Sequence, residues 1–454
     1  HGWNSSSMQY KSSVVIDNMR ILYDWSLDEN RMKLFVSALM QCLTRKNMEL
    51  LIWNALPVRN NVDVLIDEYH GECEHTMKER GGRRITPFIL YIGDQSCHDM
   101  LKALEQRHQI VTQHVRPLSV DKILRDRQPA SSGILEKIVN KMNLKASGLN
   151  YSVRPDDINI PLWCPSGRKS TLVIGIDVAH PPPLSRYERM RGTPEDPSVI
   201  GIAANVSAEY EYFSGNFVFT KCRREAATEG IMHGVGKDLA KKFYETRGCL
   251  AETVICFRDG VNEAQYPAIK DGEFADLMEG IREYASSQGG VAANSDPRDI
   301  LIICTKRHHV RIGRPEGNTI KNPFAGTIID KLIVTPFHPQ FYLQSAHALI
   351  GTAKSLQCTI LKDGNKDLKS LPDSWLNEIE HFTHYLCFEH QICDSPTSLP
   401  EPVFSAHEWA KRGRENFVAN RKFNIIPRSG CTNEEWTELL SYKGTALEGI
   451  RTNA

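Results

Sequence analysis

Three strand-length apolar segments follow one another in the middle of the chain, and their order constrains the fold more than any other feature. They cover residues 171–177, 199–207 and 212–220. Separations this short favour an antiparallel meander, because antiparallel neighbours need only a short connection. Helical and strand patterns then alternate, with a helix expected at 226–246, a strand at 253–257, a helix at 274–285 and a strand at 300–305.

A meander followed by alternating helices and strands is the element order of an RNase H-like mixed sheet. Residues 14–150 differ, because strand patterns at 50–53 and 86–91 alternate there with helical patterns at 28–42 and 99–107. This alternation predicts a Rossmann-like α/β layer with buried parallel strands. No G-x-G-x-x-G motif follows these strands, so a dinucleotide cofactor is not expected.

The stretch at 148–169 is rich in proline, serine and asparagine, which indicates a connection between domains. We therefore predict a Rossmann-like domain at 1–150, a connecting segment at 151–170 and an RNase H-like domain at 171–454. Because the chain opens with His1 rather than methionine, we expect it to be part of a longer protein.

The composition limits the function classes without naming one. Basic and acidic residues both number 55, so any nucleic-acid-binding surface must be local. The twelve cysteines include no C-x-x-C pair, which favours reduced thiols in an intracellular, cytoplasmic protein over a disulfide or zinc scaffold. The longest apolar runs have the length of strands, and no signal peptide is evident, so no membrane partner is expected.

Two aspartates interrupt apolar strand patterns in the second half. Asp177 ends one such pattern and Asp259 ends another. If the two strands are neighbours, both carboxylates converge and can hold Mg²⁺, as in two-metal phosphodiester hydrolysis. Each aspartate taken alone could equally cap a turn, since Asp259-Gly260 is a good turn dipeptide.

Two further side chains are candidates for the same site. Ser405 and Glu408 form a capping-box pattern, which predicts that His407 lies in the first turn of a helix. Glu225 is expected at the start of the long helix, where a glutamate often only offsets the helix dipole. Glu229, one turn later, competes with it.

The motifs around these residues resemble those of the PIWI domains of eukaryotic Argonautes, over about residues 80–425. They are Ile-Asp-Val-Ala-His-Pro-Pro at 176–182, Phe-Arg-Asp-Gly-Val-Asn-Glu at 257–263, Lys-Arg-His-His-Val-Arg at 306–311, Phe-Tyr-Leu at 341–343 and Ala-His at 406–407. The resemblance implies a MID–PIWI lobe. Its divergence from animal and plant members suggests a fungal quelling-type Argonaute.

The resemblance implies that a small guide RNA directs cleavage of a complementary target RNA by four residues, Asp177, Glu225, Asp259 and His407. Asp177, Asp259 and His407 would bind Mg²⁺, with Mn²⁺ as a substitute. Glu225 would close in as a mobile ligand. This chain alone is expected to bind a guide but to cut poorly, since the N-terminal and PAZ portions are not in it.

The resemblance also implies a pocket for the 5′ phosphate of the guide. The matching positions are His98, Lys102, Gln113, Lys141, Lys145 and Arg412, with His98 where the family usually has a tyrosine. Lys141 and Lys145 are four residues apart and share one face of a helix, although paired lysines more often form a solvated face. The ending at 449–454 lacks the aromatic residues usual in the family.

A basic cluster follows the expected strand at 300–305 and could contact RNA phosphates or 2′-hydroxyls, although a plain surface cluster is the alternative. It comprises Lys306, Arg307, His308 and His309, and the resemblance adds Lys354.

Three other interpretations stay open at this stage. They are a guide-loaded module that recruits partners without cutting, an unguided RNase H-like nuclease or integrase, and a small-molecule Rossmann enzyme. The sequence leaves undecided whether proteins with tryptophan motifs dock on the chain.

Overall fold

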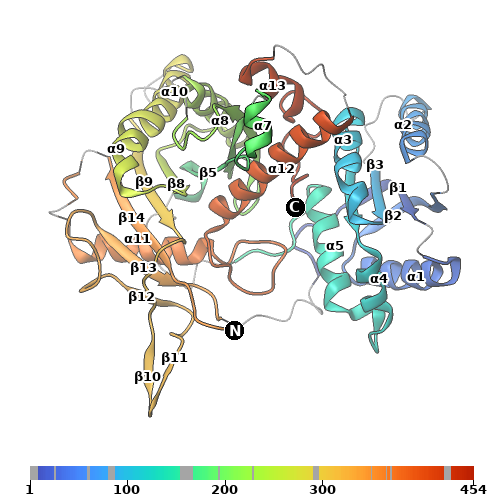
Figure 1. Ribbon diagram of the computed structural model, residues 1–454, viewed down its shortest axis with the longest axis horizontal. Coiled ribbons are helices and arrows are strands. Elements are labelled where there is room, and N and C mark those ends of the chain that lie inside the picture. Colours follow the sequence, from blue (N-terminus) through green and yellow to red (C-terminus); the bar gives the residue numbers. More distant parts are fainter. Residues whose placement is uncertain are drawn as a thin grey trace.

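The structure is a computed structural model in which two β-sheets and their helices pack against each other (Figure 1). It describes residues 9–24, 27–58, 62–79, 87–153, 167–192, 195–227, 230–289, 296–348, 350–364, 366–368, 371–423 and 431–454. Glu229 and most of the expected connecting segment lie outside these ranges. None of the helices within them is long and apolar enough to cross a membrane.

The first sheet confirms the Rossmann-like alternation. Its strands pair in parallel in the order β2-β1-β3-β4. They are β1 (Val15–Tyr23), β2 (Glu49–Pro57), β3 (Pro87–Ile92) and β4 (Val111–Val115). The helices of this part are α1 (Glu29–Arg45), α2 (Val62–Glu79), α3 (His98–His108), α4 (Pro117–Leu124) and α5 (Gly133–Lys145).

One expectation about this sheet is wrong, since the strand pattern at 50–53 is not buried. β2 is an edge strand, and Leu51, Ile52 and Trp53 are all exposed. A run of apolar residues identifies a strand but does not say whether a neighbour covers it.

The second sheet confirms the RNase H-like mixed arrangement. Within the described residues it has eight strands in the order β12-β13-β14-β9-β8-β5-β6-β7. The meander consists of β5 (Thr171–Ala179), β6 (Ser198–Ala204) and β7 (Ser214–Thr220), which pair antiparallel. The strands β8 (Thr253–Asp259) and β9 (Arg298–Thr305) continue the sheet parallel to β5. The remaining strands are β12 (Thr327–Ile329), β13 (Gln340–Gln344) and β14 (Leu356–Asp363).

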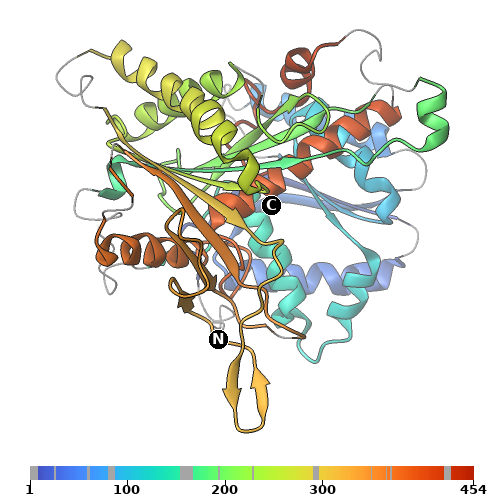
Figure 2. The same ribbon diagram turned by 60° about the vertical axis from the view of Figure 1, so that its left-hand side comes forward.

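Helices α8 (Ile231–Arg247) and α10 (Phe274–Ser287) pack together on one face of this sheet, as Figure 2 shows in green and yellow. The long helix starts later than expected, because Gly230 has a left-handed backbone and precedes the first helical residue. Other elements are α6 (Gly167–Ser170), α7 (Arg186–Met190), α9 (Tyr266–Ala268), α11 (Asp373–Leu386), α13 (Asn433–Leu440) and the hairpin of β10 (Arg314–Glu316) with β11 (Thr319–Lys321).

Helix α12 (Glu401–Phe423) joins the two halves, and it runs between the two sheets in Figure 1. It packs on β5 and β6 so closely that a Cβ at Gly175 would overlap the carbonyl of Pro402, and one at Gly201 that of Ala406. Trp409 of this helix belongs to the same apolar core as the first sheet. One helix therefore connects both halves of the molecule.

Candidate active site and anion pocket

The two strand-end aspartates lie side by side, as the sequence predicted. β5 and β8 are parallel neighbours, and Ile176 is in register with Arg258, so Asp177 and Asp259 occupy equivalent positions. Burial, and then the charge of Asp177, raise the pKa of Asp259 to about 6. Asp259 also accepts a hydrogen bond from the Gly260 amide at 2.7 Å, so it caps the turn as well. A buried carboxylate next to a second carboxylate favours a bound cation.

His407 completes this group from the other half of the molecule. Its Nδ1 lies 2.7 Å from Oδ2 of Asp177, and this hydrogen bond raises the pKa of His407. The expectation that His407 lies in a first helical turn is wrong. The helix begins at Glu401, and the Ser405 hydroxyl donates to Glu401 instead of capping. Pro402 was the available signal, because proline is tolerated in a first turn.

Glu225 reaches the site from the loop before α8, and not from the first turn of that helix as expected. A Cβ at Gly260 would lie 3.0 Å from Oε1 of Glu225 and 3.9 Å from Oδ1 of Asp177. The two carboxylates therefore face the same glycine, and they come from segments 48 residues apart, as the numbers 225 and 177 show.

Two residues that the sequence analysis did not single out hold Glu225. Arg258 is fully buried, and its guanidinium lies 3.2 Å from the carboxylate of Glu225 and donates to its carbonyl at 2.6 Å. The same guanidinium pairs with Glu273 at 2.8 Å. His180 Nε2 lies 2.8 Å from the other carboxylate oxygen. Arg258 could have been found as a charge inside an apolar strand, next to Asp259.

The donor types at this site suit Mg²⁺ or Mn²⁺, which accept carboxylate oxygens and imidazole nitrogen. Within the described ranges, no three or more such side chains are already arranged as a metal-binding group. Burial first, and then the charge of Asp177, raise the pKa of Asp259, and a divalent cation would offset both effects.

A separate cavity of about 400 Å³ lies between the first sheet and α12. All six residues expected to bind a 5′ phosphate line it, namely His98, Lys102, Gln113, Lys141, Lys145 and Arg412. Arg116, Lys137 and Lys411 also line it and were missed, because isolated surface-type basic residues carry no spacing signal. The cavity is therefore strongly basic even though the whole chain has no net charge.

Two of the lysines that line this cavity, Lys102 and Lys145, are not solvated surface residues. Lys102 and Lys145 are each 2% exposed. Lys102 donates to Glu105 at 2.9 Å and to the Thr112 hydroxyl at 2.8 Å, and burial lowers its pKa to about 8. Burial also lowers the pKa of Lys141 and Lys145. An anion in the cavity would stabilise the charged form of all three.

Several buried polar atoms of this cavity have no hydrogen-bond partner among the described residues. Two are donors, Nε and Nη1 of Arg412; Nδ1 of His98 donates or accepts according to its tautomer, and Oε1 of Gln113 is an acceptor. Unpaired buried donors cost free energy unless a ligand or water satisfies them. Donors gathered around a basic cavity therefore indicate a binding site for an anion.

The sequence matches the Piwi domain over residues 90–418. The chain belongs to the Piwi-domain family. Argonaute protein wago-1 of Caenorhabditis elegans is 29% identical over 397 residues, which cover 85% of this chain and 39% of that protein. The chain thus spans about two fifths of the length of this curated relative.

Solved structures identify the fold as that of an Argonaute MID–PIWI lobe. The C-terminal lobe of a budding yeast Argonaute has a TM-score of 0.78 at 18% identity, covering 100% of this chain and 88% of that one. Kluyveromyces polysporus Argonaute with a guide RNA has a TM-score of 0.75 at 19% identity, covering 100% and 53%. The domain boundaries at 150 and 170 stay predictions.

The basic cluster of this Piwi-domain chain is only partly available to a ligand. Lys306 donates to the Ser398 carbonyl at 3.3 Å, and burial lowers its pKa to about 8. His308 contacts the Ser355 carbonyl at 2.9 Å. The residues with exposed side chains are Arg307, His309 and Lys354. Lys306 and His308 each have one contact to a backbone carbonyl, and the assignment of all five residues to the RNA path stays a prediction.

Proposed function

We propose that this lobe belongs to a small-RNA-guided silencing protein and holds the 5′-phosphorylated end of a guide RNA in the basic cavity. The observation that carries the proposal is a cavity lined by five lysines, beside which Nε and Nη1 of the buried Arg412 make no hydrogen bond. Nη1 has only long ion pairs, at 3.9 Å to Glu105 and 3.7 Å to Glu415. A phosphate offers several acceptor oxygens and enough charge to pair with these groups.

The lining of the cavity supports selectivity for an end. Its basic residues come from α3, α5 and α12 and would surround a terminal phosphate, whereas exposed residues such as Arg307 and Lys354 would contact the continuing backbone. Contacts of that second kind position RNA without reading its sequence. Choice of a target RNA is then left to base pairing with the guide.

Cleavage of the paired target RNA is the second part of the proposal, and it refers to the full-length protein. Asp177, Asp259 and His407 would hold Mg²⁺ or Mn²⁺, which supply an activated water and stabilise the leaving oxygen. Glu225 faces the same point, and Arg258 and His180 fix its carboxylate there. These four side chains are of the types that a two-metal hydrolysis uses, which supports the proposal.

The binding proposal is tested with a short single-stranded RNA, with and without a 5′ phosphate, at fixed salt, because nonspecific phosphate contacts depend on salt. The chain should prefer the phosphorylated RNA, and Lys141→Ala/Lys145→Ala should abolish that preference. The matched control is Lys33→Ala/Lys241→Ala, which removes two exposed lysines outside the cavity. Equal binding of both RNAs by the unmodified chain would remove the proposed pocket.

Narrower assignments remain predictions. These are the fungal quelling type, a cytoplasmic location and docking of proteins with tryptophan motifs. If the chain prefers 5′-phosphorylated RNA but the full-length protein does not cleave a paired target, the protein is a guide-binding module that does not cut.

A further inference from the structure

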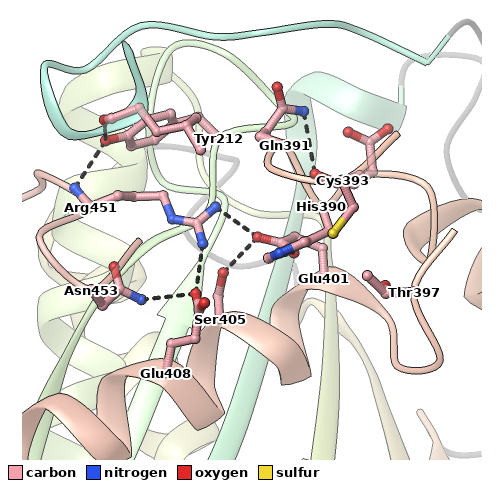
Figure 3. Close-up of polar contacts among 12 residues, drawn as sticks. Tyr212, His390, Gln391, Cys393, Thr397, Glu401, Ser405, Glu408, Arg451 and Asn453 are labelled. Carbon is pink, nitrogen blue, oxygen red and sulfur yellow. Dashed lines mark hydrogen bonds and ion pairs between the residues drawn. The ribbon is translucent and has the colours of Figure 1, made fainter. Parts of the chain in front are cut away.

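The segment at 449–454 lies between the basic cavity and α12. Arg451 and Thr452 are completely buried, and Ala454 lines the cavity. Figure 3 shows Arg451 reaching into a group of polar side chains that includes Glu401, Ser405 and Glu408 of α12. The segment thus contacts the cavity with its backbone and α12 with its arginine.

The guanidinium of Arg451 is held by two carboxylates of α12. It pairs with Glu401 at 2.8 Å and with Glu408 at 3.0 Å (Figure 3). Glu401 is also paired with His390 at 2.7 Å. Burial alone would lower the pKa of His390, but the attraction of Glu401 is stronger, and the pKa of His390 is raised to about 10. The positive charges of Arg451 and His390 therefore balance the negative charges of Glu401 and Glu408. Buried charges need such partners.

The next residue connects this group to the cavity. The carbonyl of Thr452 accepts a hydrogen bond from Lys145 at 2.7 Å and another from Arg412 at 2.9 Å. These two cations repel each other, so one fixed acceptor between them lowers the cost of keeping them close. Each spends only part of its donor capacity there. Nε and Nη1 of Arg412 make no hydrogen bond, although Nη1 lies 3.9 Å from Glu105 and 3.7 Å from Glu415.

We propose that Arg451 is a positioning residue for the phosphate cavity: its pairing with Glu401 and Glu408 fixes the Thr452 carbonyl, which holds Lys145 and Arg412 in place before an anion arrives. The inference rests on the proposed phosphate-binding function. A prearranged pair of cations binds more tightly, because less conformational freedom is lost on binding.

Arg451→Met tests this role, because methionine fills similar space but cannot pair with either carboxylate. We expect the ratio of Kd values for 5′-hydroxyl and 5′-phosphorylated RNA to fall about tenfold, roughly the loss of one charge-assisted hydrogen bond. Binding of the 5′-hydroxyl RNA should change little. Arg451→Lys should lose less, because one ammonium can still pair with one of the carboxylates.

Arg20→Met is the matched control, since Arg20 is also a buried arginine with a glutamate partner, Glu72, but does not line the cavity. It should leave the ratio unchanged even if it lowers the melting temperature. If Arg451→Met does not fold, Arg451→Lys and Glu408→Gln test the inference in its place. Both should reduce the ratio of Kd values for 5′-hydroxyl and 5′-phosphorylated RNA.

An unchanged ratio in folded Arg451 variants, with a clear phosphate preference in the unmodified chain, overturns this inference alone. No phosphate preference in the unmodified chain would instead overturn the proposed function.

Discussion

His407 Nδ1 lies 2.7 Å from Oδ2 of Asp177, although the two residues are 230 positions apart in the chain. Asp177 comes from the interior strand β5 and His407 from α12, the helix that also supplies Arg412 to the basic cavity. The same helix therefore carries His407 of one site and Lys411, Arg412 and Glu415 of the other. A change in how α12 packs on the sheet would affect both.

Asp177→Asn should abolish guided cleavage while leaving guide binding intact. The asparagine amide keeps the shape of the side chain but lacks the negative charge of the carboxylate. It would bind a metal ion less well and would weaken the hydrogen bond to His407. We expect the cleavage rate of the full-length protein to fall on the order of 10³-fold or more, as for loss of a central charge-stabilising group. Single-turnover cleavage of a matched target measures this, and near-normal cutting would contradict the assignment of the site.

Arg258→Lys should reduce cleavage through Glu225. A lysine has one compact charge and cannot serve the carboxylates of Glu225 and Glu273 together with the Glu225 carbonyl. We expect the cleavage rate of the full-length protein to fall about 10²-fold in Arg258→Lys, and by the same factor or more in Glu225→Gln. The double variant should be no worse than Glu225→Gln alone. Losses that multiply would show that Arg258 does not act through Glu225.

The preference for a 5′ phosphate should weaken as the pH rises above about 8. Burial lowers the pKa of Lys102 to about 8, although Glu105 acts in the opposite direction. Above that value the guide-free protein must take up a proton to bind, so affinity falls by up to about tenfold per pH unit. The 5′-hydroxyl RNA is the control. Lys102→Met should make the dependence shallower, and an identical slope would exclude Lys102 as its source.

Gly175→Ala should destabilise the fold strongly. Its Cβ would overlap the carbonyl of Pro402, which is backbone and cannot rotate away. We expect a loss of about 3 kcal/mol in the free energy of unfolding, at the upper end for overpacking. Gly234→Ala is the matched control, because nothing lies within 4 Å of the added Cβ in a helix interior. Chemical denaturation of both variants measures the difference, and equal stability would contradict the close packing of α12.

The sequence alone determined the elements and the chemistry available to them. Apolar periodicity located the meander and the alternating layers, because it reflects which face of each element is buried. Aspartates at the ends of two apolar strands indicated converging carboxylates, and the spacing of Lys141 and Lys145 placed them on one helix face, α5. These features depend on residues close together in the chain.

Only the tertiary structure decided how distant segments meet. The Thr452 carbonyl contacts Lys145 across 307 positions, and nothing in the pattern at 449–454 indicates it. The position of Glu225 depends on Arg258 and His180, and the exposure of β2 depends on its place at the edge of the sheet. Local periodicity records that a residue is buried but not which partner buries it, and that partner is fixed only when the two halves pack around α12.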